Sequence, residues 1–167
     1  MKTLITLMFV SAFVSFTACA QQPAASPRAK ATGKAGNATI TMDYGQPAVK
    51  GRKIFGDLVP YGKVWRTGAN EATVFETDGD IKVDGKTLPK GKYGLFTIPG
   101  EKEWVVIFNK TWNQWGSFRY KQEEDVLRVT VPAKSAPAMT ESMTFKVDGG
   151  KLWFMWDNAM FECTLSQ

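Results

Sequence analysis

Apolar and polar residues alternate along much of the chain after residue 38, as they do in strands that bury one face. Ile40, Met42 and Tyr44 share one face of residues 39–44, and Tyr93 and Leu95 share one face of residues 91–99. Strand patterns of this or a related kind cover residues 39–44, 72–77, 81–83, 86–88, 91–99, 104–108, 126–131, 143–147, 151–156 and 160–165. Turn signals recur at spacings of about 8–12 residues, and no long segment has a helical period. The pattern predicts an all-β fold, a single antiparallel β-sandwich of jelly-roll or immunoglobulin-like type.

Three segments refine this prediction. Residues 104–108 are almost continuously apolar, which indicates a strand buried on both faces. Asp84-Gly85 and Asp148-Gly149-Gly150 are typical of tight turns between paired strands. Residues 112–124 are the least strand-like part, and we expect a long loop or one helical turn there.

The N-terminus has the pattern of an export signal. Lys2 precedes an apolar run, Leu4–Phe16, that is too short to span a membrane and ends in small residues before Cys19. We therefore predict a signal peptide over residues 1–18. Cleavage before Cys19 would leave a cysteine for lipidation and anchor the protein in the membrane.

A second cleavage site is open. Ala18-Cys19-Ala20 fits an A-x-A site cut before Gln21, which would release a soluble periplasmic or secreted protein. Phe16 stands where a lipobox usually has Leu, but a rare cysteine stands where lipidation needs one, so we favour the lipoprotein. Neither Ala20 nor Gln21 is acidic, which in a Gram-negative cell favours the periplasmic side of the outer membrane.

Residues 19–38 contain no large apolar side chain, so we expect a flexible tether there and one domain over residues 39–167. The chain carries a net charge of +5. Most of this excess lies in Lys2 and in Arg28, Lys30 and Lys34 of the predicted tether. The remaining domain is nearly neutral, which argues against a nucleic-acid partner.

The chain has no histidine and two cysteines, Cys19 and Cys163. These counts exclude a serine–histidine–aspartate triad, a cysteine–histidine pair and a histidine-ligated zinc site. Cys163 alternates with Phe161 and Leu165, which indicates a buried core residue. Clustered aspartates at 78, 80 and 84 are more typical of turns than of a calcium site. We predict no metal and no cofactor.

Two polar patches beside aromatic residues are candidates for ligand binding. Residues 65–71 place Arg, Asn and Glu beside Trp, where Arg could hold a carboxylate or phosphate. Residues 109–115 offer amides and two Trp on a loop, an arrangement suited to stacking a sugar ring. The candidate residues are Trp65, Arg66, Asn70, Glu71, Asn109, Trp112, Asn113 and Trp115. Alternatively, the Arg–Glu pair holds the two sheets together and Trp65 fills the core.

Longer strings of sequence resemble one family. Residues 44–56, 58–73 and 91–100, followed by residues 104–110 and 113–116, are similar to the bacterial domain-of-unknown-function family 2911. The resemblance covers about residue 39 to the C-terminus. It implies an exported or lipid-anchored β-domain, and it brings no established activity and no catalytic residue.

Three functions fit these features. The first, which we favour, is a non-catalytic envelope domain that binds a small polar ligand, a glycan or an envelope protein. The second is a carboxylate-based hydrolase such as a glycosidase, with Glu71 and Glu76 or Asp157 as its acid and base. The glutamates are five positions apart, so one continuous strand would point them to opposite faces. The third is a structural or chaperone-like assembly module.

Overall fold

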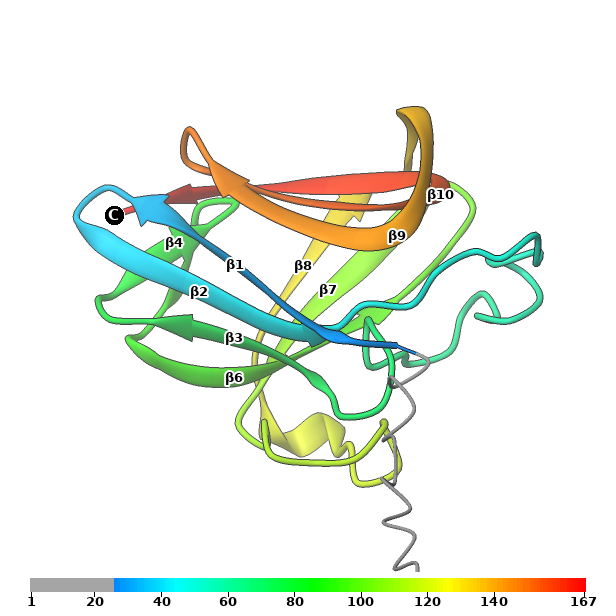
Figure 1. Ribbon diagram of the computed structural model, residues 1–167. Helices are drawn as coiled ribbons and strands as arrows, with labels where there is room; N and C mark the ends of the chain where they lie inside the picture. The colour runs from blue at the N-terminus through cyan, green and yellow to red at the C-terminus, as the bar shows by residue number, and fades with distance from the viewer. Residues whose placement is uncertain (1–25) are drawn as a thin grey trace, which may run out of the picture.

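Residues 26–167 are the part of the chain that the computed structural model describes, and they form two antiparallel sheets packed face to face (Figure 1). The six-stranded sheet has the order β1 (Arg28–Ala35), β2 (Ala38–Gly45), β3 (Thr73–Thr77), β6 (Gly91–Ile98), β7 (Glu103–Asn109), β8 (Asp125–Pro132). The four-stranded sheet has the order β5 (Lys86–Leu88), β4 (Ile81–Val83), β10 (Lys151–Ser166), β9 (Lys134–Asp148). The predicted all-β sandwich is confirmed.

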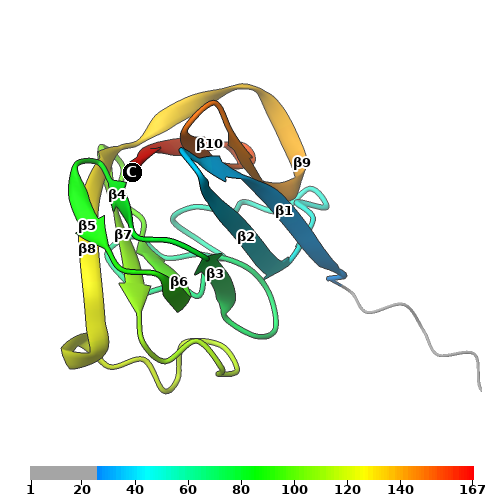
Figure 2. The ribbon, with the colours of Figure 1, turned by 90° about the vertical axis from the view of Figure 1, so that its left-hand side faces the viewer.

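The two sheets are in contact along both of their edges. Figure 1 shows β9 and β10 above the six-stranded sheet, and β1 contacts β9 at one side. Figure 2 shows the β4–β5 hairpin beside β8 at the other side, where β5 and β8 are in contact. The 3-10 helix η1 (Gln122–Glu124) ends the long loop between β7 and β8. Within residues 26–167, no helix is long and apolar enough to cross a membrane.

Most predicted strands lie where the pattern put them, and two are longer. Residues 151–156 and 160–165 belong to one strand, β10, whose pairing with β9 is irregular around Asp157, a residue with φ of 55°. β9 begins at Lys134, well before the predicted residue 143. Its first half is mainly exposed, so pairing with β10 rather than apolar burial makes it a strand.

The predicted flexible tether over residues 19–38 is wrong for residues 28–38. Arg28–Ala35 form β1, which pairs with β2 along its whole length, from Arg28 opposite Gly45 to Ala35 opposite Ala38. Its inward side chains are small because β1 lies close to β9: a Cβ at Gly33 would be 2.3 Å from the Val147 carbonyl oxygen. The lack of large apolar residues therefore reflects close packing here. The predicted signal peptide and Cys19 lie outside the described residues.

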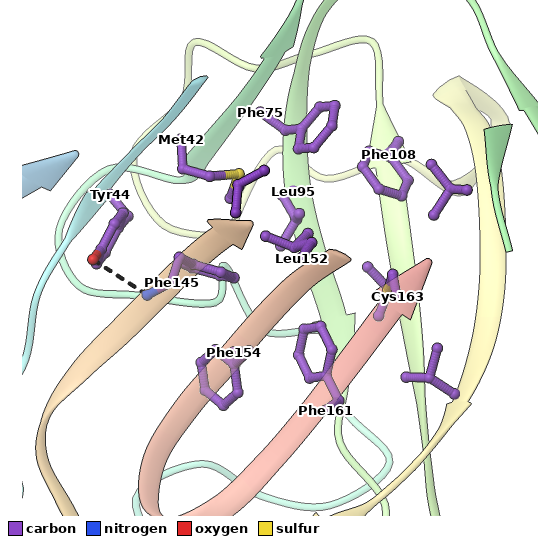
Figure 3. Packing of buried hydrophobic residues seen from close by; sticks show 14 of the residues in the cluster. Met42, Tyr44, Phe75, Leu95, Phe108, Phe145, Leu152, Phe154, Phe161 and Cys163 are labelled. Atoms are coloured by element: carbon purple, nitrogen blue, oxygen red, sulfur yellow. Dashed lines mark hydrogen bonds between the residues drawn. The ribbon is translucent and has the colours of Figure 1, made fainter. Parts of the chain in front are cut away.

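The main core lies between the sheets (Figure 3). Phe154 and Phe161 of β10 stack with their ring centroids 5.0 Å apart, facing side chains of the six-stranded sheet. The Phe145 amide donates a hydrogen bond of 3.2 Å to the Tyr44 hydroxyl, which joins the two layers. Cys163 is fully buried between them, as predicted, and burial raises the pKa of its thiol well above the ordinary value. Such a thiol is unreactive, which fits a packing role.

β7 is buried on both faces, as its sequence predicted. Trp104, Val106 and Phe108 pack in the main core. Ile107 points the other way, into a second cluster with Phe96. This cluster lies on the outer face of the six-stranded sheet, where Tyr120 of the β7–β8 loop packs on Phe96 with 5.2 Å between ring centroids. The cluster thereby holds that loop against the sheet.

Candidate functional site

The two predicted patches are joined through the backbone. The Ala72 amide donates to the Gln114 carbonyl at 2.9 Å, and the Gly116 amide donates to the Asn70 carbonyl at 3.0 Å. Glu71 and Trp115 form an isolated β-bridge between these two bonds. The turn after Trp65 and the β7–β8 loop therefore form one continuous wall beside the outer face of the six-stranded sheet.

An open cleft of about 410 Å³ lies on this face, and we name it the mixed-charge cleft. Alternation along β1, β2, β3 and β6 turns the polar side chains of these strands outward, and Glu71 joins them from the turn before β3. The six charged residues that line it are Arg28, Lys30, Asp43, Glu71, Glu76 and Lys92. Trp112 and Asn113 of the β7–β8 loop complete the wall.

The charges in this cleft are paired with each other. Arg28 Nε donates to Asp43 Oδ1 at 2.9 Å, and Arg28 Nη1 lies 3.4 Å from Glu71 Oε2. Lys30 Nζ lies 3.8 Å from Asp43 Oδ2, and Lys92 Nζ lies 3.8 Å from Glu76 Oε2. All these groups are partly exposed, so each pair adds little to stability. Together they leave a cleft that is polar and close to neutral.

Trp112 stands at the edge of the mixed-charge cleft with 37% of its surface exposed. Lys92 Nζ lies 4.2 Å from the centroid of its ring, a cation–π contact. Gly94 of β6 allows the loop to lie this close, because a Cβ there would be 2.9 Å from the Thr111 carbonyl oxygen and 3.3 Å from Trp112 Cα. The position of the indole thus depends on a glycine in the strand beneath it.

Asn109 positions this loop and does not line the mixed-charge cleft. Its side chain is fully buried, and its Nδ2 donates to the Lys121 carbonyl at 2.9 Å and to Asp125 Oδ1 at 2.8 Å. Its Oδ1 accepts the Thr111 amide at 2.9 Å. With these partners inside the protein, Asn109 has a structural role, unlike the ligand contact that we expected.

Trp65 is a core residue, in line with the alternative interpretation of its patch. It is 9% exposed and stacks on Trp156 with 5.8 Å between ring centroids. The rings of Phe55 and Phe154 meet it edge-on. Trp65 also lines a second, smaller cleft.

This second cleft, of about 280 Å³, contains Arg66 and Asn70 of the first patch together with Arg52, and we name it the arginine cleft. It shares no lining residue with the mixed-charge cleft. Asn70 Nδ2 donates to the Ser26 carbonyl at 3.2 Å. Burial lowers the pKa of Arg66, whose Nε has no hydrogen-bond partner among residues 26–167. Sequence neighbours thus separate: Glu71 lines one cleft, and Arg66 and Asn70 line the other.

Trp115 lies outside both clefts. It is 61% exposed and lines a neighbouring open depression of about 580 Å³ with Phe118, which is 87% exposed, and Arg119. Glu71, Asn113 and Gln114 line both this depression and the mixed-charge cleft. The β7–β8 loop therefore has one partly exposed Trp at the mixed-charge cleft and one more exposed Trp at the neighbouring depression.

Sequence reasoning missed several residues of both clefts. Arg28 and Lys30 were assigned to a tether, although the outward position of Asp43 on β2 indicated a polar outer face. The lining residues Arg52 and Trp156 had no local signal, since one lies in a loop and the other in a core strand.

The clustered aspartates make turn contacts. Asp78 Oδ1 accepts the Thr39 amide at 2.6 Å, which is the main cause of the lowered pKa of Asp78. Asp84 Oδ1 accepts the Thr164 amide at 2.8 Å. Within residues 26–167, no group of three or more histidine, cysteine, aspartate or glutamate residues could hold a metal ion.

The sequence model of one family, described as "Protein of unknown function (DUF2911)", matches residues 26–165. The chain belongs to this family. No curated protein and no solved structure matches the chain. The family match includes β1, in agreement with the domain boundary that the sheet pairing sets.

Proposed function

We propose that this DUF2911 protein is a non-catalytic cell-envelope domain that binds a neutral, hydroxyl-rich ligand such as a glycan in the mixed-charge cleft. The observation that carries the proposal is the half-exposed Trp112 beside a floor on which three cations and three carboxylates balance each other. A flat aromatic ring suits the C–H face of a sugar, and a net-neutral floor gives no preference for an ion.

The polar groups of the cleft match the needs of hydroxyl groups, which both donate and accept. Asp43, Glu71 and Glu76 supply acceptors, Arg28 and Lys30 supply donors, and the amide of Asn113 supplies both. All these contacts are exposed enough to exchange water for ligand at little cost.

Lys92 now covers one face of Trp112. A sugar that stacks on that face would displace the ammonium, at a cost of about 0.5–1 kcal/mol for an exposed cation–π contact. Lys92 would retain its pair with Glu76, so the displacement leaves no isolated charge.

The envelope location rests on the sequence alone. Lys2, the apolar run and Cys19 support export and a lipid anchor on Cys19, with the protein on the periplasmic side of the outer membrane. Cleavage before Gln21 would give a soluble periplasmic or secreted form of the same domain. In either form the partner would be an envelope glycan or a small polar molecule.

One observation favours a second candidate, a carboxylate-based hydrolase. Glu71 and Glu76 line the same cleft, because the left-handed backbone at Asn70, with φ of 64°, separates Glu71 from the alternation of β3. A glycosidase needs one protonated carboxyl as general acid. Each of these carboxylates is already engaged in an ion pair, Glu71 with Arg28 and Glu76 with Lys92, so we expect binding without cleavage.

Calorimetric titration of the purified protein with neutral oligosaccharides of glucose and of N-acetylglucosamine tests the proposal. We expect at least one series to bind, Trp112→Ala to weaken that binding about tenfold, and Trp115→Ala to leave it within about twofold. Binding that Trp112→Ala leaves intact would contradict the proposal, and so would failure of both series. Release of new reducing ends during incubation would favour the hydrolase instead.

A further inference from the structure

We infer that the arginine cleft is a second binding site, which takes the carboxylate group of a small ligand with an apolar body. This goes beyond the proposed function, since the two clefts have no lining residue in common. The inference rests on two buried donors without acceptors, on two arginines without an acid, and on the apolar walls around them.

The two donors are Arg66 Nε and Trp156 Nε1. Neither has a hydrogen-bond partner among residues 26–167, although both atoms are buried and both residues line the arginine cleft. A buried donor that bonds to nothing has lost its water without replacement, which destabilises the fold. An acceptor oxygen that reaches these donors through the cleft would recover that loss, so the cleft is suited to a ligand with acceptor oxygens.

The charged residues of the arginine cleft also favour a ligand with acceptor oxygens, and in particular an anion. Its lining contains Arg52 and Arg66 and no acidic residue. Arg52 is held by neutral acceptors, with its Nε donating to the Val49 carbonyl at 3.0 Å and its Nη2 to the Ala48 carbonyl at 2.5 Å. None of the ion pairs within residues 26–167 includes either arginine. The lowered pKa of Arg66 has the same cause, a guanidinium desolvated without a counter-charge.

The remaining walls indicate what kind of anion fits. Pro47, Leu58, Val59 and Trp65 line the cleft with apolar surface, and Leu58 is 47% exposed at its edge. A phosphate ion would leave this surface uncovered. A planar carboxylate matches the fork of a guanidinium, and an apolar substituent of about amino-acid size would cover the walls within 280 Å³.

The backbone that carries Arg66 is strained in a way that fixes the cleft. Thr67, a β-branched residue, has φ of 52°, a left-handed conformation that such residues rarely adopt. Its hydroxyl lies 3.0 Å from that of Thr97, and its carbonyl accepts the Thr73 hydroxyl at 2.7 Å. These buried bonds hold a conformation that directs Arg66 and Asn70 into the arginine cleft and Glu71 out of it.

The indole N–H of Trp156 gives a direct readout in ¹H–¹⁵N correlation spectra, with Trp156→Phe to assign its resonance. The probes are benzoate, its neutral isostere benzamide, and inorganic phosphate. We expect benzoate to shift this resonance downfield, as a new hydrogen bond does, and benzamide to bind at least tenfold more weakly. Arg66→Gln should weaken benzoate binding about tenfold, whereas Arg119→Gln, which removes a charge on the exposed β7–β8 loop, should leave it unchanged.

Each other outcome overturns the inference. Equal shifts with benzoate and benzamide would mean that the charge of the ligand is not recognised. Binding of phosphate without benzoate would mean an ion site and no carboxylate site. If Arg66→Gln fails to fold, Arg66→Lys keeps the charge but loses the fork, and unchanged benzoate affinity in that variant would exclude bidentate recognition.

Discussion

The mixed-charge cleft and the arginine cleft lie on either side of the same short turn, residues 66–71, yet they treat charge in opposite ways. In the first, Arg28, Lys30 and Lys92 face three carboxylates, and each cation has an anionic neighbour within the protein. In the second, Arg52 and Arg66 have no acid beside them. The ligand preference of a cleft therefore follows from the charge that the fold leaves uncompensated, and not from its number of charged residues.

The same difference extends to hydrogen bonding. Asn109, buried beneath the wall of the mixed-charge cleft, uses its donors and its acceptor within the protein. In the arginine cleft, Arg66 Nε and Trp156 Nε1 have no acceptor among residues 26–167. Gln114 of the mixed-charge cleft has a buried acceptor, Oε1, without a partner among these residues. The first cleft is therefore suited to an incoming donor such as a hydroxyl group, whereas the second gains most from an incoming acceptor.

The largest effect should follow from removing the space beneath Trp112. Gly94→Val would force side-chain atoms into the Thr111 carbonyl and Trp112 Cα, which a Cβ alone would approach to 2.9 and 3.3 Å. We expect oligosaccharide binding to fall more than tenfold and the free energy of unfolding to fall by about 1–3 kcal/mol. Calorimetric titration and urea unfolding measure the two changes. Benzoate binding should survive in Gly94→Val. The control Thr130→Val changes an exposed residue of β8 on the same outer face of the sheet and should alter neither oligosaccharide binding nor stability. Loss of both ligands in Gly94→Val would mean that the clefts are not independent.

A charge change should convert one cleft toward the other. Asp43→Asn removes the carboxylate that pairs with Arg28 and Lys30 and leaves the mixed-charge cleft cationic. We expect a new, weak binding site for benzoate and an oligosaccharide affinity lowered about fivefold, measured by titration. Asp148→Asn, which removes an exposed acid 3.1 Å from Lys146 on β9, is the matched control. A variant that gains no anion site would show that charge balance is not what separates the clefts.

Stability and binding should change in opposite directions at Arg66. Arg66→Met keeps an unbranched chain but removes the unpartnered Nε and the desolvated charge, so we expect the free energy of unfolding to rise by about 1 kcal/mol. Benzoate binding should be lost at the same time. Urea unfolding without ligand measures the first change; a clear loss of stability would indicate that Arg66 is structural and that the arginine cleft is not a site.

The smallest expected effect is a pH dependence of the β7–β8 loop, whose Trp112 lines the mixed-charge cleft. Burial, with Asp125 nearby, raises the pKa of Tyr120 to about 12. Tyr120 donates to Asp125 Oδ2 at 2.7 Å and accepts from Arg128 Nη2 at 2.5 Å, which fastens the β7–β8 loop. The folded-state pKa is above that of an unfolded tyrosine, so this contribution is complete below about pH 10 and is lost as pH rises toward 12.

Tyr120→Phe should therefore remove part of the fall in unfolding free energy between pH 9 and about pH 11, measured by urea unfolding at both values. Tyr61→Phe, a change at a tyrosine that is 39% exposed, should keep that fall. A Tyr120→Phe profile identical to that of the parent would show that Tyr120 does not titrate within this window.

Much of the fold could be predicted from local pattern. Alternation located β2 and β6, continuous apolar sequence located β7, and Asp84-Gly85 marked a hairpin in which both residues have positive φ, 46° and 79°. β1 was not predicted because its inward residues are small. Their fit against β9 depends on a strand more than a hundred residues away, which local composition cannot reveal.

The candidate sites could be predicted only in part, because tertiary contacts decide which side chains share a cleft. Residue type alone identified Trp112, Asn113 and Glu71, which line one cleft. It could not separate Arg66 from Glu71, because that separation depends on a left-handed Thr67 held by buried hydroxyl groups. The pairing of Arg66 with Trp156 is likewise tertiary, since the indole reaches the cleft from β10.

The most direct test of the contrast between the clefts follows the indole N–H resonances of Trp112 and Trp156 in one ¹H–¹⁵N spectrum, during separate titrations with a neutral oligosaccharide and with benzoate. Trp112→Phe and Trp156→Phe assign the two signals. We predict that the oligosaccharide moves the Trp112 resonance alone and that benzoate moves the Trp156 resonance alone. If both ligands move the same indole, or if neither moves any, the account of two clefts with opposite preferences is wrong.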